Sequence, residues 1–472
     1  MNQEKEYMHD ENLIQEVVYR YKQMLRNDKS CFFDVHEFEF IIDYFIQHND
    51  LNNARKASEI ASQQHPTSSN LKLKKVQVLI DKGETQNAIN LLNEIEIVEL
   101  NNHELFYLKG LAYNMLEKTI EATEYFNLAI KYNTDDESDL YYNIALSYEN
   151  INNFEKATEY LFTAHNLDPS NLSVLYELGY CFDRLGNYLK SSEYYNLYLD
   201  IDPFSDTVWF NLGCSYSKAE DFIKAIEAFD FALALNDNYI LAYFNKANSL
   251  ANSGNYKKAI EVYKEYLSFE EDNLEALCYI GECYERAGRL EKALEYYQKV
   301  LKIDSSYPDA LYGLGIVYCI QNNFELSLQY LKRAIEMKPD NPEYYYSLGN
   351  ICFKLCRFDT ALEAYQNAVK IDLHDYESWL NLSEIYYKKN LLSKAIKTLE
   401  EAHKSNPGIA LINYRLAAFY FLRHDFSAGI VYLKKGVTIN HKEHKELLKF
   451  CPDAFRIEEV AQLVGQYLKS KS

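Results

Sequence analysis

The stretch SDTVWFNLGCSYSKAEDFIKAIEAF, residues 205–229, decides the fold of this chain. Two other stretches repeat its layout: SDLYYNIALSYENINNFEKATEY from Ser138 and YESWLNLSEIYYKKNLLSKAIKTL from Tyr376. Aligned on their small residues, all three fall on a spacing of 34 residues. Repeats then start at 138, 172, 206, 240, 274, 308, 342, 376 and 410 and, before one extra residue at Glu137, at 35, 69 and 103. The spacing predicts twelve repeats.

Two places in the repeat hold small residues, which indicates closely crossing helices. The eighth place is Gly, Ala or Ser in ten repeats, and the twentieth is Ala, Ser or Gly in all twelve. The eleventh and twenty-fourth places are mostly aromatic or bulky, as in Tyr216 and Phe229. Small side chains let the ridges of one helix enter the grooves of the next, and large rings fill the space beside them. Much of the excess of 43 tyrosines is therefore expected to be packing.

The turns repeat as well. The fifteenth place is Gly or Asn in eight repeats: Asn49, Gly83, Asn152, Gly186, Gly254, Gly288, Asn322 and Asn390. These two residue types best tolerate the left-handed backbone that ends a helix. Apolar residues between the turns follow helical spacing. Each repeat is therefore predicted to be two helices joined by a tight turn, and neighbouring pairs must stack to bury their apolar faces.

This pattern resembles the tetratricopeptide repeat. Trp209, Leu212, Gly213, Tyr216, Ala225, Phe229 and Ala232 carry the resemblance most clearly. It implies an all-α, right-handed superhelical solenoid of antiparallel helix pairs, with a concave groove lined by the first helix of each pair. The predicted repeats are 35–68, 69–102, 103–136, 138–171, 172–205, 206–239, 240–273, 274–307, 308–341, 342–375, 376–409 and 410–443. Residues 1–34 and 444–472 are expected to form terminal caps.

The resemblance also implies which residues face the groove. Place five is aromatic in eight repeats, at Tyr107, Tyr142, Tyr176, Phe210, Phe244, Tyr312, Tyr346 and Tyr414. Place six carries an amide at Asn143, Asn211, Asn245 and Asn381. Aromatic rings offer large contact areas, and an amide can pair with both N–H and C=O of an extended peptide. We expect these twelve residues to form a partner-binding surface, although both residue types are also common in the repeat for packing reasons.

Charge along the groove is expected to be mixed. Place two is acidic at Glu104, Asp139, Glu275, Asp309, Glu343 and Glu377, and place nine is acidic at Glu282 and Glu384. Place thirteen is basic in five repeats. Chaperone-binding members of the family hold a terminal carboxylate with a Lys/Asn/Arg clamp, and no consecutive repeats here carry that set. The formal net charge of -21 disfavours nucleic acid and anionic membranes as partners. A protein segment, extended or helical and with basic residues, fits better.

At the ends, apolar residues at helical spacing predict capping helices. Over residues 11–27 these are Leu13, Ile14, Val17, Val18, Tyr21, Met24 and Leu25. Leu447, Leu448 and Phe450 precede a break at Cys451-Pro452-Asp453, and Val460, Leu463, Val464, Tyr467 and Leu468 mark a final helix. Docking or dimerisation through these helices, and hence self-association, is the alternative.

No catalytic chemistry is apparent. The sequence contains no P-loop or dinucleotide fingerprint and no zinc spacing, so neither an enzymatic activity nor a cofactor is predicted. It also contains no membrane-spanning run or secretory signal, and its nine dispersed cysteines fit a reducing, cytoplasmic location. The sequence predicts a protein-interaction scaffold or adaptor. A regulatory or assembly subunit of a separately encoded enzyme or secretion complex is the alternative, and a nucleic-acid-binding helical repeat is a third reading.

Overall fold

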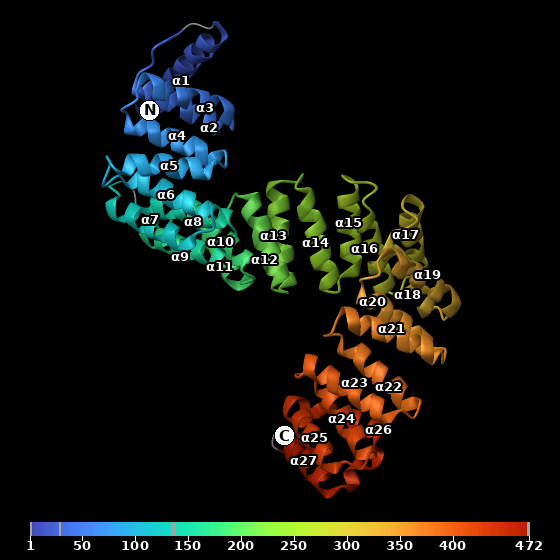
Figure 1. Cartoon of the computed structure of the whole chain (residues 1–472). Helices are drawn as coiled ribbons and strands as arrows, with labels where there is room; N and C mark the ends of the chain where they lie inside the picture. Colours follow the sequence, from blue (N-terminus) through green and yellow to red (C-terminus); the bar gives the residue numbers. More distant parts are fainter. Residues whose placement is uncertain (1, 28–29, 135–136, 470–472) are drawn as a thin grey trace. The chain divides into compact units, whose positions relative to one another are not determined.

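The chain is an array of helix pairs in a computed structural model (Figure 1). The structure describes residues 2–27, 30–134 and 137–469, with side chains over 14–27, 30–134 and 137–464. No strand occurs in these residues, and the predicted all-α solenoid of helix pairs is confirmed.

The first helices of the pairs are α2 (Val35–Gln47), α4 (Ser69–Asp81), α6 (His103–Met115), α8 (Glu137–Asn150), α10 (Leu172–Arg184), α12 (Asp206–Lys218), α14 (Ile240–Asn252), α16 (Leu274–Arg286), α18 (Pro308–Ile320), α20 (Pro342–Lys354), α22 (Tyr376–Lys388) and α24 (Ala410–Leu422). The second helices are α3 (Leu51–Gln64), α5 (Thr85–Glu96), α7 (Thr119–Tyr132), α9 (Phe154–Leu167), α11 (Tyr188–Ile201), α13 (Phe222–Leu235), α15 (Tyr256–Leu267), α17 (Leu290–Ile303), α19 (Phe324–Met337), α21 (Phe358–Ile371), α23 (Leu392–Ser405) and α25 (Phe426–Asn440). We propose the division into twelve repeats over residues 35–443 on these helix starts.

The small residues of place eight meet the rings of place twenty-four. A Cβ built on Gly213 would lie 2.6 Å from the ring of Phe229, and one on Gly281 would lie 2.7 Å from the ring of Tyr297. These distances are shorter than any ordinary contact, so only glycine lets the two helices of these pairs approach so closely. The packing role predicted for both places is thereby confirmed.

The left-handed turns are confirmed in all eight predicted repeats, where φ lies between 56° and 81°. The remaining four repeats adopt the same backbone at Glu117, Glu220, Cys356 and His424, with φ between 56° and 63°. The turn geometry is therefore kept even where the residue type does not favour it.

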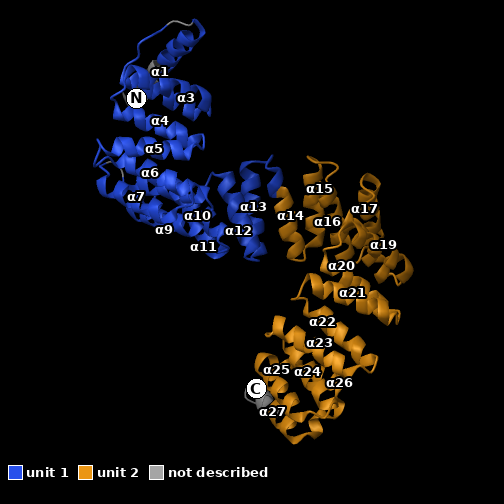
Figure 2. Cartoon of the chain, viewed as in Figure 1, with its two compact units in different colours: residues 1–242 blue, residues 243–472 orange. Residues whose placement is uncertain are grey.

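Two compact units make up the chain, residues 1–242 and residues 243–472 (Figure 2). Within each unit, buried aliphatic and aromatic side chains form the core between successive helices. In the part of the chain that the structure describes, no helix is both long and apolar enough to cross a membrane. All nine cysteines are free thiols.

The N-terminal helix α1 (Asn2–Asn27) packs on α2 through Val17, Val18 and Tyr21, which are at most 3% exposed. Leu25 was expected on the same face but is 40% exposed. The side chain of Leu13 lies outside the described residues.

Four short elements follow α25 at the C-terminus: η1 (His441–His444), α26 (Lys445–Phe450), η2 (Pro452–Arg456) and α27 (Glu458–Lys469). Helix α27 packs against α25, with Val460 and Val464 buried. The side chains of Tyr467 and Leu468 lie outside the described residues.

Candidate partner-binding groove

Five of the eight aromatic residues of place five share one packing contact. In five repeats the ring rests against the place-twenty-four ring of the same repeat, with centroids 5.8 to 6.2 Å apart. These pairs are Tyr107–Phe126, Tyr176–Tyr195, Phe210–Phe229, Phe244–Tyr263 and Tyr346–Tyr365. Each ring is therefore held in a fixed orientation, and part of its surface is already used within the fold.

Tyr107 and Asn143 come together in a pocket of about 530 Å³ on the first helices of unit 1. We call it the amide pocket; Gln77, Ile80, Asp81, Tyr107, Leu111, Asn114, Met115, Asn143, Leu146, Ser147, Asn150 and Ile151 line it. Burial, together with Asp81, raises the pKa of Tyr107 to about 12, so the phenol stays protonated. The pocket combines aliphatic walls with several amide groups.

The amides of this pocket have unused hydrogen-bonding capacity. Asn143 is exposed and has no hydrogen-bond partner among the described residues. Asn114 is 1% exposed, and its Nδ2 donates to the carbonyl of Ser147 at 2.8 Å. Its Oδ1 is buried with no partner in the described part of the chain. A buried acceptor left unpaired is costly, so these amides favour a partner that brings donors.

Tyr142 and Tyr176 line a second pocket of unit 1, of about 260 Å³. The hydroxyl of Tyr176 accepts a hydrogen bond from Asn211 Nδ2 at 3.2 Å. Glu177 also lines this pocket; burial and the nearby Glu149 raise its pKa to about 7. Asn211 is thus already paired within the fold, unlike Asn143.

Seven of the twelve predicted residues line none of these pockets, Phe210, Phe244 and Asn245 among them. Phe210 stacks on Tyr239 with centroids 4.7 Å apart. Phe244 lies 5.1 Å from the ring of Tyr266, and Asn245 is half-buried on the same helix. The two rings serve packing in this structure.

Tyr312 lies in a strongly acidic pocket of about 380 Å³ in unit 2. We call it the acidic pocket; Glu275, Cys278, Tyr279, Glu282, Glu285, Arg286, Tyr297, Tyr307, Asp309, Tyr312, Gly313, Ile316, Asn341, Glu343 and Tyr344 line it. Five of these are carboxylates and one is a cation. Arg286 pairs with Glu282 on its own helix at 2.7 Å. The pocket therefore carries an excess of negative charge.

Glu285 shows the effect of this excess. Burial, the first cause, and the nearby Glu282 raise its pKa to about 7, although Tyr297 donates a hydrogen bond to it at 3.1 Å. The sequence reasoning noted the carboxylates at places two and nine but missed Glu285. The resemblance implies that its place, the twelfth, faces the groove. Acidic residues at place two of three successive repeats, together with Glu285, could therefore have indicated the pocket.

The remaining predicted residues lie toward the C-terminal end. Tyr346 donates to Glu377 at 2.5 Å, and Asn381 donates to Asn350 at 3.2 Å. Tyr414 was expected to line the groove, but it is 0% exposed and donates to the carbonyl of Asn440 at 3.0 Å. That expectation is wrong because η1 and α26 pack against α24.

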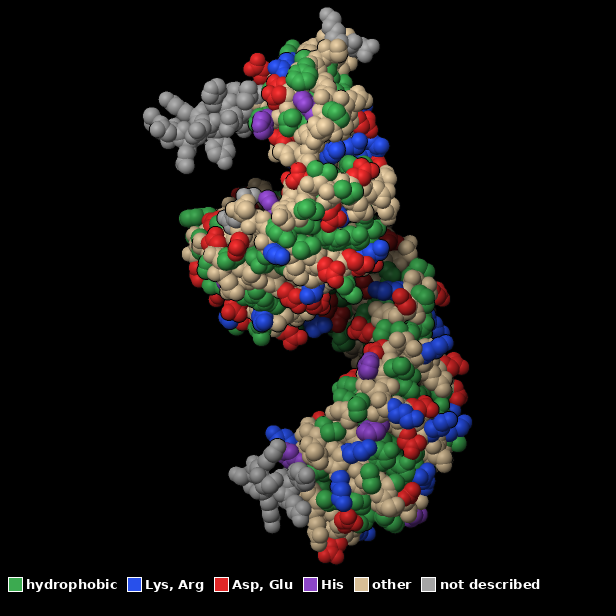
Figure 3. Space-filling model, turned by 60° about the vertical axis from the view of Figure 1, so that its left-hand side comes forward, with side chains coloured by type: hydrophobic (Ala, Val, Ile, Leu, Met, Phe, Trp, Pro, Cys, Tyr) green, Lys and Arg blue, Asp and Glu red, His purple; other side chains and the backbone are tan. Residues whose placement is uncertain are grey.

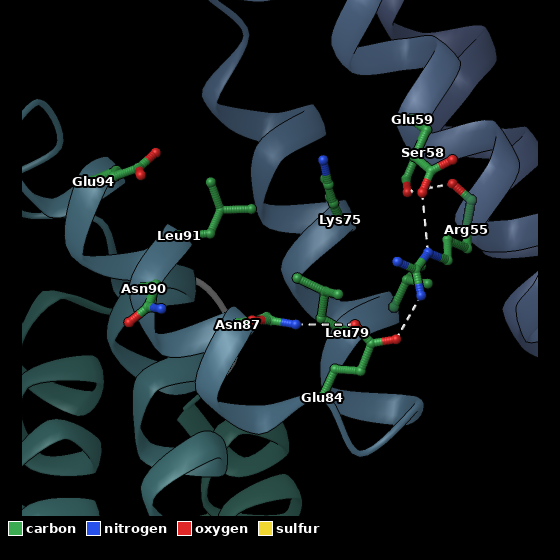
Figure 4. Close-up of a pocket in the computed structure, with 11 residues that line it drawn as sticks. Arg55, Ser58, Glu59, Lys75, Leu79, Glu84, Asn87, Asn90, Leu91 and Glu94 are labelled. Atoms are coloured by element: carbon green, nitrogen blue, oxygen red, sulfur yellow. Dashed lines mark hydrogen bonds and ion pairs between the residues drawn. The ribbon is translucent and has the colours of Figure 1, made fainter.

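Another pocket, of about 310 Å³, lies among α3, α4 and α5 (Figure 4). Arg55 points toward both Glu59 and Glu84 there, at 3.0 and 2.6 Å, and Asn87 donates to Glu84. Because Arg55, Glu59 and Glu84 pair with one another, we do not assign it a ligand. On the face drawn in Figure 3, acidic, basic and hydrophobic side chains are interspersed.

The described residues offer no metal site, and burial keeps two of the cysteine thiols protonated. They contain no group of three His, Cys, Asp or Glu residues arranged to hold a metal ion. Burial, followed by nearby carboxylates, raises the pKa of the Cys181 and Cys278 thiols, which therefore stay protonated. To a ligand, these surfaces offer rings, amides and carboxylates.

Models of the tetratricopeptide repeat match residues 103–136, 142–206, 206–239, 240–306, 272–340, 342–375 and 376–408, which together make up more than half of the chain. The predicted repeats over 35–102 and 410–443 are not among these matches. The comparison with curated proteins gave no match.

Solved structures of several repeat proteins are similar to parts of the chain. MamA is 25% identical over 34% of this chain and 94% of its own, with a TM-score of 0.31. YrrB, described as a TPR protein with an unusual peptide-binding site, is 23% identical over 40% of this chain and 97% of its own, with a TM-score of 0.34. A tetratricopeptide repeat protein from Parabacteroides merdae is 16% identical over 55% of this chain and 98% of its own, with a TM-score of 0.43.

The family assignment follows from the repeat models and from the helix pairs. Both agree on the same repeating unit of two helices. The chain belongs to the tetratricopeptide repeat family, whose repeats support a general role in holding other proteins.

Proposed function

We propose that this protein is an adaptor that binds segments of partner proteins on the faces of its first helices, and that its partners present basic side chains. The observation that carries the proposal is the acidic pocket, in which five carboxylates, one cation and several tyrosines line one cavity. A Lys or Arg side chain entering it would compensate both the burial and the nearby Glu282 charge, which raise the pKa of Glu285.

Aromatic rings suit the same ligand. Tyr279, Tyr312 and Tyr344 line the acidic pocket, and Tyr312 and Tyr344 stack with centroids 4.8 Å apart. A cation is attracted to the face of such a ring as well as to a carboxylate. The pocket therefore favours a guanidinium or ammonium group over a neutral side chain.

The amide pocket adds a second kind of contact. Asn143 and the Oδ1 of Asn114 lack partners among the described residues, and Leu111 and Leu146 supply apolar walls. An extended segment could pair its backbone with the amides and place an apolar side chain between the walls. The excess of carboxylates disfavours nucleic acid as the occupant.

The test is a screen of the full-length chain against an array of peptides with varied charge. Peptides with Lys or Arg next to an aromatic residue should be enriched, and their affinity should fall as salt rises. The double variant Glu282→Gln with Glu343→Gln should lose at least tenfold in affinity for them. The matched control is Glu291→Gln on α17, an exposed carboxylate outside the pocket.

Two results would contradict the proposal. One is enrichment of neutral or acidic peptides. The other is binding of basic peptides that the control variant weakens as much as the pocket variant does.

A further inference from the structure

The face of α22 and α24 in the last two pairs is covered by a piece of the chain itself. Helix α26 lies beside α24 and reaches α22, whereas α27 packs on α25 (Figure 1). A cap needs only to cover the last helix pair, and α27 already covers α25. Helix α26 also contacts α22, one repeat further back, which a cap does not require.

Three side chains of α26 make its polar and aromatic contacts, and they lie on one helical face. Glu446, Lys449 and Phe450 are spaced i, i+3 and i+4, which places them side by side. Pro452 follows closely, and it cannot donate a helical hydrogen bond. The segment is thus a short helix of 6 residues that presents an acidic, a basic and an aromatic side chain.

Glu446 meets a buried cation. Arg415 on α24 is 4% exposed, and its Nε lies 2.6 Å from Glu446 Oε1. The same guanidinium donates to the carbonyl of Leu380 on α22. A charge buried this deeply requires its partner, so the pair fixes the segment firmly.

Lys449 and Phe450 reach the earlier repeat. Lys449 Nζ lies 3.0 Å from Glu384 Oε2, across 65 residues of sequence. The ring of Phe450 lies 5.2 Å from Phe419 on α24 and 5.5 Å from Tyr387 on α22, and the Arg415 guanidinium lies 4.7 Å from it. In the family, the places held by Glu384 and Tyr387 face the groove where partners bind.

We propose that the face of α22 and α24 is a binding site for a short helical segment bearing an acid, a base and a neighbouring aromatic ring, and that residues 445–450 occupy it as an internal ligand. The inference rests on the proposed function only in treating the first helices as a docking surface. A partner segment with the same three groups would compete with residues 445–450. The tether gives the internal segment a high effective concentration, so the site is closed by default.

The experiment uses the full-length chain and a fluorescein-labelled peptide of residues 441–456, with binding followed by anisotropy. Two variants weaken the internal contact: Phe450→Ala and Lys449→Glu. The side chain of Lys449 is half exposed, so the second variant should fold even if the first does not. Both should bind the peptide at least tenfold more tightly than the wild type does, because apparent affinity scales with the open fraction.

A matched control separates an internal ligand from a cap. Val460→Ala removes a buried contact between α27 and α25 without touching Glu384, Arg415 or Tyr387. It should destabilise the C-terminus and leave peptide binding at the wild-type level. Glu384→Lys combined with Phe450→Ala should abolish binding of the wild-type peptide, and a peptide carrying the Lys449→Glu change should restore it.

The inference is overturned if neither opening variant binds the peptide, or if Val460→Ala binds it as tightly as they do. The segment is then a cap. Failure of the proposed function would instead show as loss of peptide selectivity at the acidic pocket, which these variants leave intact.

Discussion

The acidic pocket and the face of α22 and α24 carry the same residue at the same place of the repeat. Glu282 and Glu384 both occupy place nine, and both lie in unit 2. In the acidic pocket, Glu282 lies near Glu285. Burial and neighbouring carboxylates, Glu282 among them, raise the pKa of Glu285 to about 7. On α22, burial would also raise the pKa of Glu384, but Lys449, Arg415 and Lys388 together hold it below its ordinary value.

The two faces differ in whether a segment of the chain packs on them. Lys449, Phe450 and Glu446 cover one face, and no segment in the described residues covers the other in this way. The comparison indicates that a carboxylate-lined face of this array becomes electrostatically satisfied once a basic and aromatic segment binds it. We propose that the acidic pocket binds such a segment of a partner protein.

The largest expected effect comes from removing the cation at each site. Arg415→Met should destabilise α22, α24 and α26 by about 3 to 5 kcal/mol, because Glu446 is left buried without its partner. Arg286→Met in the acidic pocket should cost less than about 1 kcal/mol, because its ion pair is exposed. Urea unfolding followed by the fluorescence of Trp379, which is 7% exposed on α22, reports the first change. Hydrogen exchange in α16 reports the second.

A second variant checks the reason for this prediction. Combining Arg415→Met with Glu446→Met should recover most of the lost stability, since a buried ion pair can often be replaced by apolar side chains of similar size. If the double variant is as unstable as the single one, the ion pair is not the cause.

The pH dependence of stability should have opposite signs at the two sites. The pKa of Glu285 is raised in the folded chain. Its contribution to the free energy of unfolding is therefore full below about pH 4.5 and is lost as the pH rises through about 7. The expected change is about 2 kcal/mol after allowance for partial exposure. The pKa of Glu384 is lowered in the folded chain. Its contribution to the free energy of unfolding is therefore present above the ordinary pKa of a Glu side chain and is lost as the pH falls through the lowered pKa.

Glutamine variants isolate the contribution of each carboxylate to the pH dependence of stability. Glu285→Gln should flatten the loss of stability in α16 between pH 5 and 8, measured by hydrogen exchange corrected for intrinsic rates. Glu384→Gln should flatten the acid-induced loss seen at Trp379. Both profiles bending in the same direction would contradict the comparison.

The smallest expected effect concerns the asparagines of place six. Asn143→Ala should change stability by less than about 0.5 kcal/mol, because its side chain is exposed and unpaired in the described chain. Asn381→Ala should cost about 1 kcal/mol through loss of its hydrogen bond to Asn350. Only the Asn143 variant should weaken a partner that contacts the amide pocket. Equal losses of stability at the two positions would show that Asn143 is structural.

The helix pairs follow from sequence because each repeat places the same small and large residues at the same spacing. Gly213 and Phe229 show this plainly, since the ring fills the space that the missing Cβ leaves. The turns at Glu117 and Cys356 could not be predicted from residue type, because neighbouring packing imposes the left-handed backbone there.

The candidate site was less predictable. Spacing shows which residues share a face, but not what covers that face. Tyr414 occupies the same place as Tyr107, yet one is buried beneath the C-terminal segment and the other lines a pocket. Likewise, the ion pair of Lys449 with Glu384 joins residues 65 positions apart, and no repeat pattern predicts such a contact.

The most direct test of the central claim is site-specific photo-crosslinking in extracts of the native cells. A photoreactive phenylalanine analogue is placed at Tyr107 or Tyr279, which line the two pockets, or at Leu189, which is 76% exposed on the second helix α11. The proposed function predicts partner adducts from the pocket positions, competed by basic aromatic peptides, and none from Leu189. Adducts from Leu189 alone, or equal adducts from all three positions, would contradict it.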